Sequence, residues 1–253
     1  MSRMDQAKWA KRAIGVFLGG AIAAAGVRAD PPTATSPVMP ASGSIPTAAS
    51  TPGPQRLNLL DVVRPEFHEG VLKCVRHPTV ATKSTGDEIV CTVAVYEWLY
   101  DHPDRVALAW QRLKVPTVTI TDLGGGKFGW SDESGSEVVW QTVGTFPDGR
   151  VWFASGKVRP SVAAPFVPIQ ATFIVSHPRK AEKDGVAVFA PTVQVYVHSD
   201  SKAANLALRI IGPAAPRLAE EAAGQLLDFF GGIANVVQKN PTKADMLLGP
   251  PKK

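Results

Sequence analysis

The chain has 253 residues, with 27 Lys and Arg against 22 Asp and Glu and a formal net charge of +5. Residues 1–29 hold five basic residues and one acid, which leaves 22 basic and 21 acidic residues, a net charge of +1, for the rest. A basic domain is typical of nucleic-acid binding. Because the surplus here lies in the N-terminal segment, the charge argues against a nucleic-acid partner.

Residues 1–29 have the pattern of a signal peptide. Lys8, Lys11 and Arg12 precede an apolar run over 13–27, and Ala29 supplies a small residue at a cleavage position. The run is short for a membrane span, which needs about 20 residues. We expect cleavage after Ala29 and export to the periplasm or the extracellular space, with no membrane contact beyond this signal. An uncleaved N-terminal anchor is the alternative.

Residues 30–56 are predicted to be a disordered linker. They contain seven prolines and no aromatic residue, so they bury too little apolar surface to offset the entropy of ordering. The remaining segment, 57–249, is predicted to be a single α+β domain.

The first elements of this domain are short. Residues 57–63 suit a helix or a strand, ended by Pro65. Residues 71–75 and 88–95 are predicted to be strands joined through a polar turn at 79–86, which would make a hairpin. Cys74 and Cys91 lie on these two strands, and an even cysteine count in an exported chain favours a disulfide. Two free thiols are one alternative. A metal site with His77 is another, but it lacks a fourth ligand, so no metal is predicted.

A helix and a run of strands follow. Pro103 suits the first turn of a helix over 103–113, and Pro116 ends it. Six strands are then expected, separated by Gly- and Asp-rich turns: 117–123, 127–131, 137–145, 150–157, 169–176 and 186–197. Because no helix separates these strands, the sheet should be antiparallel.

The C-terminal part is predicted to be helical. Residues 202–211 suit a short helix, and Gly212-Pro213 should break it. Residues 213–239 carry one broad apolar stripe of a longer helix, formed by Leu218, Ala222, Leu226, Phe229, Phe230, Ile233 and Val237.

The order of these elements resembles the START-like helix-grip superfamily, which includes lipid-transfer and polyketide-cyclase-like proteins. The residues that carry the resemblance are the helix 103–113, the hairpin series 117–197 and the terminal helix 213–239. It implies a fold class of α+β, with a curved antiparallel sheet gripping a long C-terminal helix, and a cavity between them for an apolar small molecule. The expected lining is Trp140, Trp152, Leu226, Phe229, Phe230 and Ile233.

Catalytic signals are weak, and no catalytic residue is assigned. The glycines of 124–129 lack the following helix that a dinucleotide site needs, and the Ser, His and Asp of 198–201 lie too close in sequence for a triad. Glu97 and His198 are the remaining candidates for an acid or base. We expect Glu97 at a strand edge facing water, and His198 in a polar row with Gln194 and Tyr196 that faces solvent or lines a pocket.

The sequence therefore favours an exported binding or carrier protein for a hydrophobic or lipid-like small molecule, without a cofactor. A cyclase- or hydrolase-type enzyme that uses the same cavity is one alternative. A non-catalytic interaction module of the cell envelope is the other. Oligomeric state is not predicted.

Overall fold

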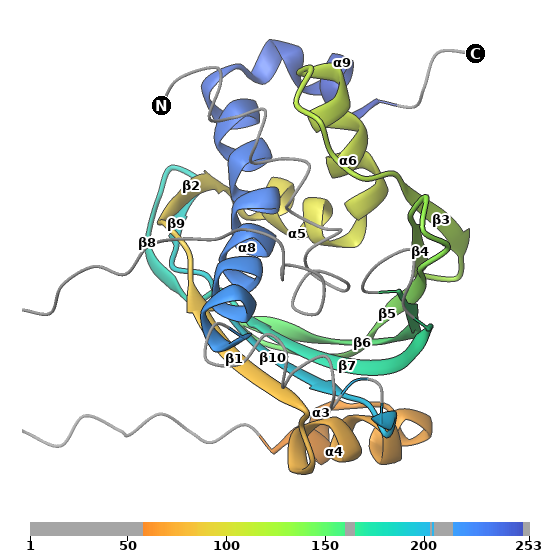
Figure 1. Cartoon of the computed structure of the whole chain (residues 1–253). Helices are drawn as coiled ribbons and strands as arrows, with labels where there is room; N and C mark the ends of the chain where they lie inside the picture. Colours follow the sequence, from red (N-terminus) through yellow and green to blue (C-terminus); the bar gives the residue numbers. More distant parts are fainter. Residues whose placement is uncertain (1–57, 160–164, 203, 205–214, 250–253) are drawn as a thin grey trace, which may run out of the picture.

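The fold is a curved antiparallel sheet that packs against a long C-terminal helix (Figure 1). The computed structural model describes residues 58–159, 165–202, 204 and 215–249. Its larger sheet has seven antiparallel strands, which in spatial order are β1 (Val80–Thr85), β10 (Thr192–His198), β7 (Val167–Ser176), β6 (Gly149–Val158), β5 (Glu137–Phe146), β4 (Lys127–Ser131) and β3 (Ile120–Gly124). The predicted fold class, α+β with a helix-grip-like arrangement, is confirmed.

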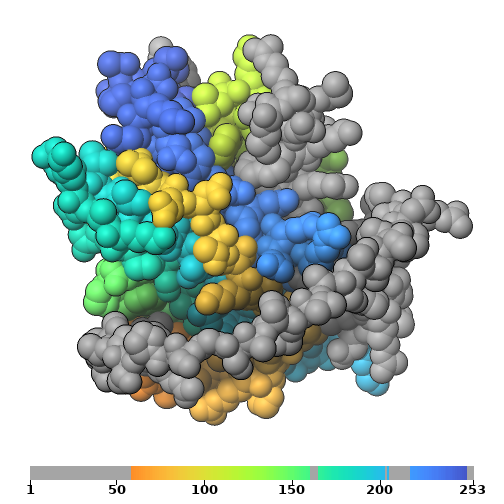
Figure 2. Space-filling model, turned by 90° about the vertical axis from the view of Figure 1, so that its left-hand side faces the viewer, coloured from red at the N-terminus to blue at the C-terminus, as the bar shows by residue number. Residues whose placement is uncertain are grey.

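A second sheet of three strands lies beside the first. It contains β2 (Ile89–Thr92), β9 (Val186–Phe189) and β8 (Arg179–Lys183). Figure 2 shows the β8–β9 hairpin standing out at one edge of the molecule. The sequence prediction of one strand over 186–197 is wrong, because the chain breaks at Ala190-Pro191 and passes from one sheet to the other. Strand β8 was missed because all five of its residues are exposed, so it has no apolar alternation.

Helices cover both faces of the larger sheet. Helix α8 (Ala215–Lys239) crosses one face together with α5 (Val93–Asp101) and α6 (Pro103–Arg112), and η4 (Pro241–Lys243) and α9 (Ala244–Leu248) end the described chain against α6 (Figure 1). Helix α3 (Leu59–Val62), η2 (Pro65–Phe67) and α4 (His68–Arg76) lie on the other face. The strands therefore carry apolar side chains on both sides.

Two apolar clusters result from this arrangement. The larger lies under α5, α6 and α8, where Leu227, Phe230 and Ile233 are fully buried. The smaller lies under α3 and α4 and includes Val151. Because successive residues of a strand face opposite sides, Val151 of β6 joins the smaller cluster and Trp152 the larger. Burying a Phe or Leu side chain contributes about 1.5–3 kcal/mol, so α8 is held mainly by its apolar stripe.

The hairpin predicted for residues 71–95 is wrong. Residues 71–75 belong to α4, whose buried Val71 and Cys74 are three residues apart and share a helix face. The five residues 71–75, four of which are apolar, are too few to distinguish the helical period from that of a strand. The supposed turn at 79–86 is strand β1, and β2 ends at Thr92, whose Oγ1 accepts a hydrogen bond from Val95 N at 3.3 Å and so caps α5.

The predicted Cys74–Cys91 disulfide is wrong for the same reason. Helix α4 lies below the larger sheet and β2 above it (Figure 1), and both thiols are free and buried. Burial raises the pKa of Cys74, and it raises the pKa of Cys91 to about 12. Both thiols are therefore protonated and unreactive at neutral pH.

Other features of the segments at the two ends stay as predictions. Two predicted segments, the signal 1–29 and the linker 30–56, lie wholly outside the described residues. The same holds for most of the predicted helix 202–211 and for the predicted break at Gly212-Pro213. The sequence of residues 57–63 suits either a helix or a strand, and in the structure Leu59–Val62 form a helix capped by Asn58. In the described part of the chain, no helix combines the length and apolar character of a membrane span.

Candidate functional site

The residues expected to line a cavity lie in or beside the larger apolar cluster. Trp152, Phe229, Phe230 and Ile233 are each at most 4% exposed, and the rings of Trp152 and Phe230 are 5.8 Å apart. Leu226 and Trp140 are partly buried against the same cluster. Four of these six side chains are therefore packed among neighbours in the core.

Glu97 does not stand at a strand edge facing water, as the sequence suggested. It lies on helix α5 with a half-exposed side chain, and its Oε2 accepts a hydrogen bond from Arg150 Nη2 at 2.5 Å. Its Oε1 lies 3.1 Å from His177 Nε2. The hydrogen bond with His177, helped by the charge of Arg150, lowers the pKa of Glu97 despite partial burial. Glu97 is thus ionised at neutral pH and fully occupied by partners.

Arg150 is the centre of this ion cluster. Its side chain is 5% exposed and also donates to Asp101 Oδ1 at 2.5 Å, while its guanidinium lies 5.2 Å from the ring centre of Tyr100. The cluster joins α5 to the start of β6 and to the end of β7, so we interpret it as a clamp between helix and sheet. Sequence reasoning missed Arg150 because its partners lie about 50 residues away in sequence.

Two tyrosines pack behind this clamp. The hydroxyls of Tyr96 and Tyr100 are 3.2 Å apart. Burial raises the pKa of both phenols, that of Tyr100 to about 12. Neither tyrosine therefore serves as a base near neutral pH.

His198 is buried on the face of the sheet that α4 covers and does not face solvent, which corrects the sequence expectation. Its Nδ1 lies 2.6 Å from the His77 carbonyl oxygen, and its Nε2 lies 2.9 Å from Asp200 Oδ1. Lys73 also pairs with Asp200 at 2.6 Å and is the main cause of that carboxyl's lowered pKa. Both ring nitrogens are therefore engaged, and His198 is not poised to act on a ligand.

The other two residues of the polar row, Gln194 and Tyr196, line a hollow, which is one of the two alternatives that the sequence allows. Gln194 and Tyr196 face a broad groove of about 1140 Å³ between α3 and the larger sheet. The Tyr196 hydroxyl donates to Gln194 Oε1 at 2.9 Å. About half of the residues that line this groove are apolar, among them Leu59, Phe146 and Ile174, but the groove is broad and open to solvent, so it encloses a small molecule poorly.

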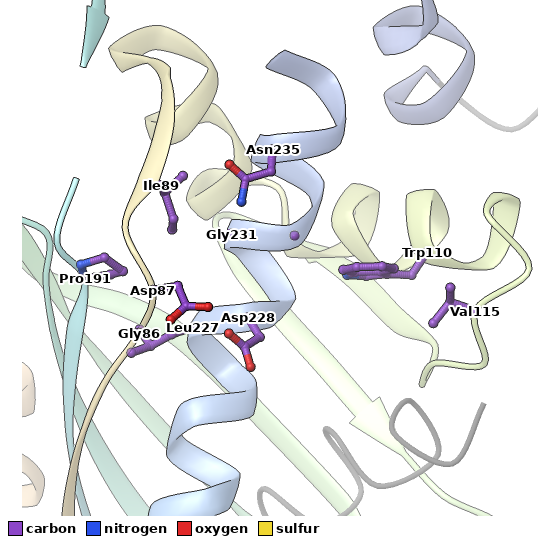
Figure 3. Close-up of a pocket in the computed structure, with 11 residues that line it drawn as sticks. Gly86, Asp87, Ile89, Trp110, Val115, Pro191, Leu227, Asp228, Gly231 and Asn235 are labelled. Atoms are coloured by element: carbon purple, nitrogen blue, oxygen red, sulfur yellow. The ribbon is translucent and has the colours of Figure 1, made fainter. Parts of the chain in front are cut away.

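A more enclosed groove lies along one flank of α8, and we call it the α8 groove. Its volume is about 320 Å³. Figure 3 shows α8 as its floor, with the segment that leads into β2 on one side and the end of α6 on the other. The lining residues are Gly86, Asp87, Ile89, Trp110, Val115, Pro191, Leu227, Asp228, Gly231, Gly232 and Asn235.

Two adjacent glycines of α8 let the walls of this groove approach the helix. A Cβ at Gly231 would lie 2.8 Å from Ile89 Cδ1, and one at Gly232 would lie 2.5 Å from Trp110 Cζ2. Each glycine costs a helix about 1 kcal/mol relative to alanine. The ring of Trp110 is fixed by its Nε1, which donates to the Phe229 carbonyl at 2.9 Å. Ile89 and Trp110 stand on opposite sides of α8 (Figure 3).

The polar groups of the groove are two carboxylates and an amide. The side chains of Asp87 and Asp228 lie next to each other, with Asn235 further along α8 (Figure 3). Burial and, second, the charge of Asp87 raise the pKa of Asp228. Within the described residues, neither carboxylate forms a hydrogen bond or an ion pair. Sequence reasoning missed both, because Asp87 lies between the predicted turn 79–86 and the predicted strand 88–95, and Asp228 belongs to the face of the helix that was expected to be in water.

A third hollow lies at the other end of the helices. It has a volume of about 540 Å³ and lies between α5, the start of α6, and the segment from the end of α8 to α9. Trp98 lines it and stacks on His102 with ring centres 4.3 Å apart. Arg105 also lines it, but its guanidinium pairs with Asp104 at 3.2 Å. No group of three or more metal-ligating side chains occurs among the described residues.

Comparison with known proteins gives no family. No protein-family model matches the chain, and no curated protein matches it. Among solved structures, it is similar to a conserved protein from Geobacillus kaustophilus, with 15% identity, a TM-score of 0.39, and coverage of 65% of this chain and 97% of that one. An uncharacterized protein from Rhizobium leguminosarum matches with 14% identity, a TM-score of 0.30, and coverage of 60% and 98%. At these TM-scores neither likeness bears on the site.

Proposed function

We propose that the protein binds a small, mostly apolar molecule and that the α8 groove is the binding site. The observation that carries this proposal is the groove itself. Its volume of about 320 Å³ lies at the lower end of the range of ligand pockets, about 300–1,000 Å³. Its walls are formed by Ile89, Trp110 and Leu227, and few polar side chains reach into it, which is the composition such pockets have.

The START-like resemblance of the element order supports an apolar ligand as an expectation, although proteins of that superfamily hold it in a cavity between the sheet and the long helix. The site proposed here lies on a flank of α8, at Asp228 and Gly231. The cavity lining expected from the sequence, which includes Phe230 and Trp152, lies instead in the apolar core between α8 and the sheet. Neither Glu97 nor His198 takes part, since each is held by partners away from the groove.

Export belongs to the same proposal. The signal pattern of residues 1–29 and the proline-rich segment 30–56 suit a binding domain that is released from a membrane into the periplasm or the extracellular space. Edman sequencing of the exported protein should then begin at Asp30. Exported protein that retains Met1 would favour the anchor.

The proposal is tested by titrating the mature chain with three aromatic probes of one size: phenethylamine, 2-phenylethanol and 3-phenylpropionate. Tryptophan fluorescence reports binding, because Trp110 lines the groove. We expect at least one probe to give a saturable change with a dissociation constant of about 1 mM, which corresponds to about −4.1 kcal/mol.

A variant that fills the groove locates the binding. Asn235→Phe places a ring in the groove and should abolish saturation. Glu220→Phe is the matched control, because Glu220 is exposed on the same helix and does not line the groove. Saturation by no probe, or equal saturation in wild type and Asn235→Phe, would overturn the proposal.

A further inference from the structure

We propose that the α8 groove selects molecules that carry a positively charged amine, which would sit between Asp87 and Asp228. This inference rests on the proposed function and specifies the class of ligand. It follows from the placement of the two carboxylates, from the partners of the charged residues around them, and from the apolar walls on either side.

The fold holds the two carboxylates together from different elements. Gly86 N donates to the Pro191 carbonyl at 2.9 Å, which fixes the segment between β1 and β2. A Cβ at Gly86 would lie 3.0 Å from the Leu227 Cβ, so the absence of a side chain lets this segment pack directly on α8. As a result Asp87 lies beside Asp228, the residue that follows Leu227 (Figure 3).

The acidic residue next to this pair has a basic partner, whereas Asp87 and Asp228 have none among the described residues. Glu88, the next residue after Asp87, is paired with Lys180 at 2.6 Å. In the part of the chain that the structure describes, Asp87 and Asp228 have no basic partner. The two adjacent carboxylates repel each other, and the partial burial of Asp228 adds to the cost of its ionisation, whereas the side chain of Asp87 is exposed. The raised pKa of Asp228 reflects both effects. A cation between the two would remove this penalty.

The walls favour an organic cation over a metal ion. Mg²⁺ and Ca²⁺ need six or more oxygen ligands, including waters, while most of this groove is lined by Ile89, Trp110, Leu227, Val115 and Pro191. An alkylammonium or arylalkylammonium group offers three N–H donors on an apolar body. Two donors would satisfy the carboxylates, the third would point to solvent, and the body would extend along the apolar walls towards Asn235, which lies further along α8 (Figure 3).

The test compares the same three probes in 0.15 M salt. Phenethylamine should bind at least about tenfold more tightly than 2-phenylethanol, and 3-phenylpropionate should bind least. In Asp87→Asn/Asp228→Asn the preference for the amine, measured as the ratio of the dissociation constants of 2-phenylethanol and phenethylamine, should fall to within about twofold. Glu220→Gln removes one negative charge from the same helix outside the groove and should leave the preference intact.

The outcomes separate this inference from the proposed function. If the probes bind but the amine is not preferred, or if its preference survives in the double variant, the inference is wrong and the binding site stands. If no probe binds to the wild-type protein, both are wrong. The double variant relieves repulsion, so it should remain folded, and circular dichroism checks this.

Discussion

Substitution of Gly232 by alanine tests how closely Trp110 packs on α8. A Cβ at this position would lie 2.5 Å from Trp110 Cζ2 and 2.6 Å from Cη2. The ring has little freedom to retreat, because its Nε1 is bonded to the Phe229 carbonyl at 2.9 Å. Forcing a group into such a contact costs about 1–3 kcal/mol. The gain in helix propensity, about 1 kcal/mol, offsets only part of this cost.

Gly224 provides the matched control on the same helix. A Cβ there would meet only Ser84 Oγ, at 3.3 Å, and that hydroxyl can rotate. Gly224→Ala should therefore be stabilising by up to about 1 kcal/mol, and Gly232→Ala should be less stable than it by about 1–3 kcal/mol. Urea denaturation followed by circular dichroism measures both free energies of unfolding. Equal stability of the two variants would refute the close packing that shapes the groove.

Three further predictions concern the ion cluster and the thiols. Arg150→Met removes the charged partner of Glu97 and Asp101, so it should lower the free energy of unfolding by about 1.5–3 kcal/mol. Urea denaturation measures this loss, and Arg150→Lys should recover only part of it. Since the pKa of Glu97 is lowered, its stabilising effect is present above its usual pKa and is lost as pH falls through the lowered value. Glu97→Gln should flatten the acid side of a thermal-stability profile, and an unchanged profile would contradict the pairing. Cys74 and Cys91 should resist Ellman's reagent in the folded protein and both react in denaturant; absence of thiols in denaturant would contradict this.

Much of the fold follows from local patterns in the sequence. Residues 127–131, 137–145 and 150–157 alternate and are separated by turn residues, so β4, β5 and β6 were predicted within about two residues. Helix α8 was predicted because its apolar stripe persists over many turns. Errors arose where the pattern was short or polar. Helix α4 reads as a strand in a five-residue window, and β8 has no buried side.

The candidate site was largely invisible to sequence reasoning. The pairing of Glu97 with Arg150 and with His177 joins three elements that are distant in sequence. Asp87 and Asp228 likewise meet only after the segment before β2 packs on α8. The Gly231-Gly232 pair in a helix was the one available signal, because glycines inside a helix often mark close packing.

The central claim is that a small molecule binds in the α8 groove, and the indole N–H resonances of the tryptophans test it most directly. In a ¹⁵N-labelled chain that begins at Asp30 these resonances can be assigned with single Trp→Phe variants. Titration with phenethylamine should shift the Trp110 resonance saturably and leave those of Trp140 and Trp152 in place, since these two lie away from the groove. A shift of Trp140 or Trp152 without Trp110 would place the ligand between sheet and helix and contradict the account.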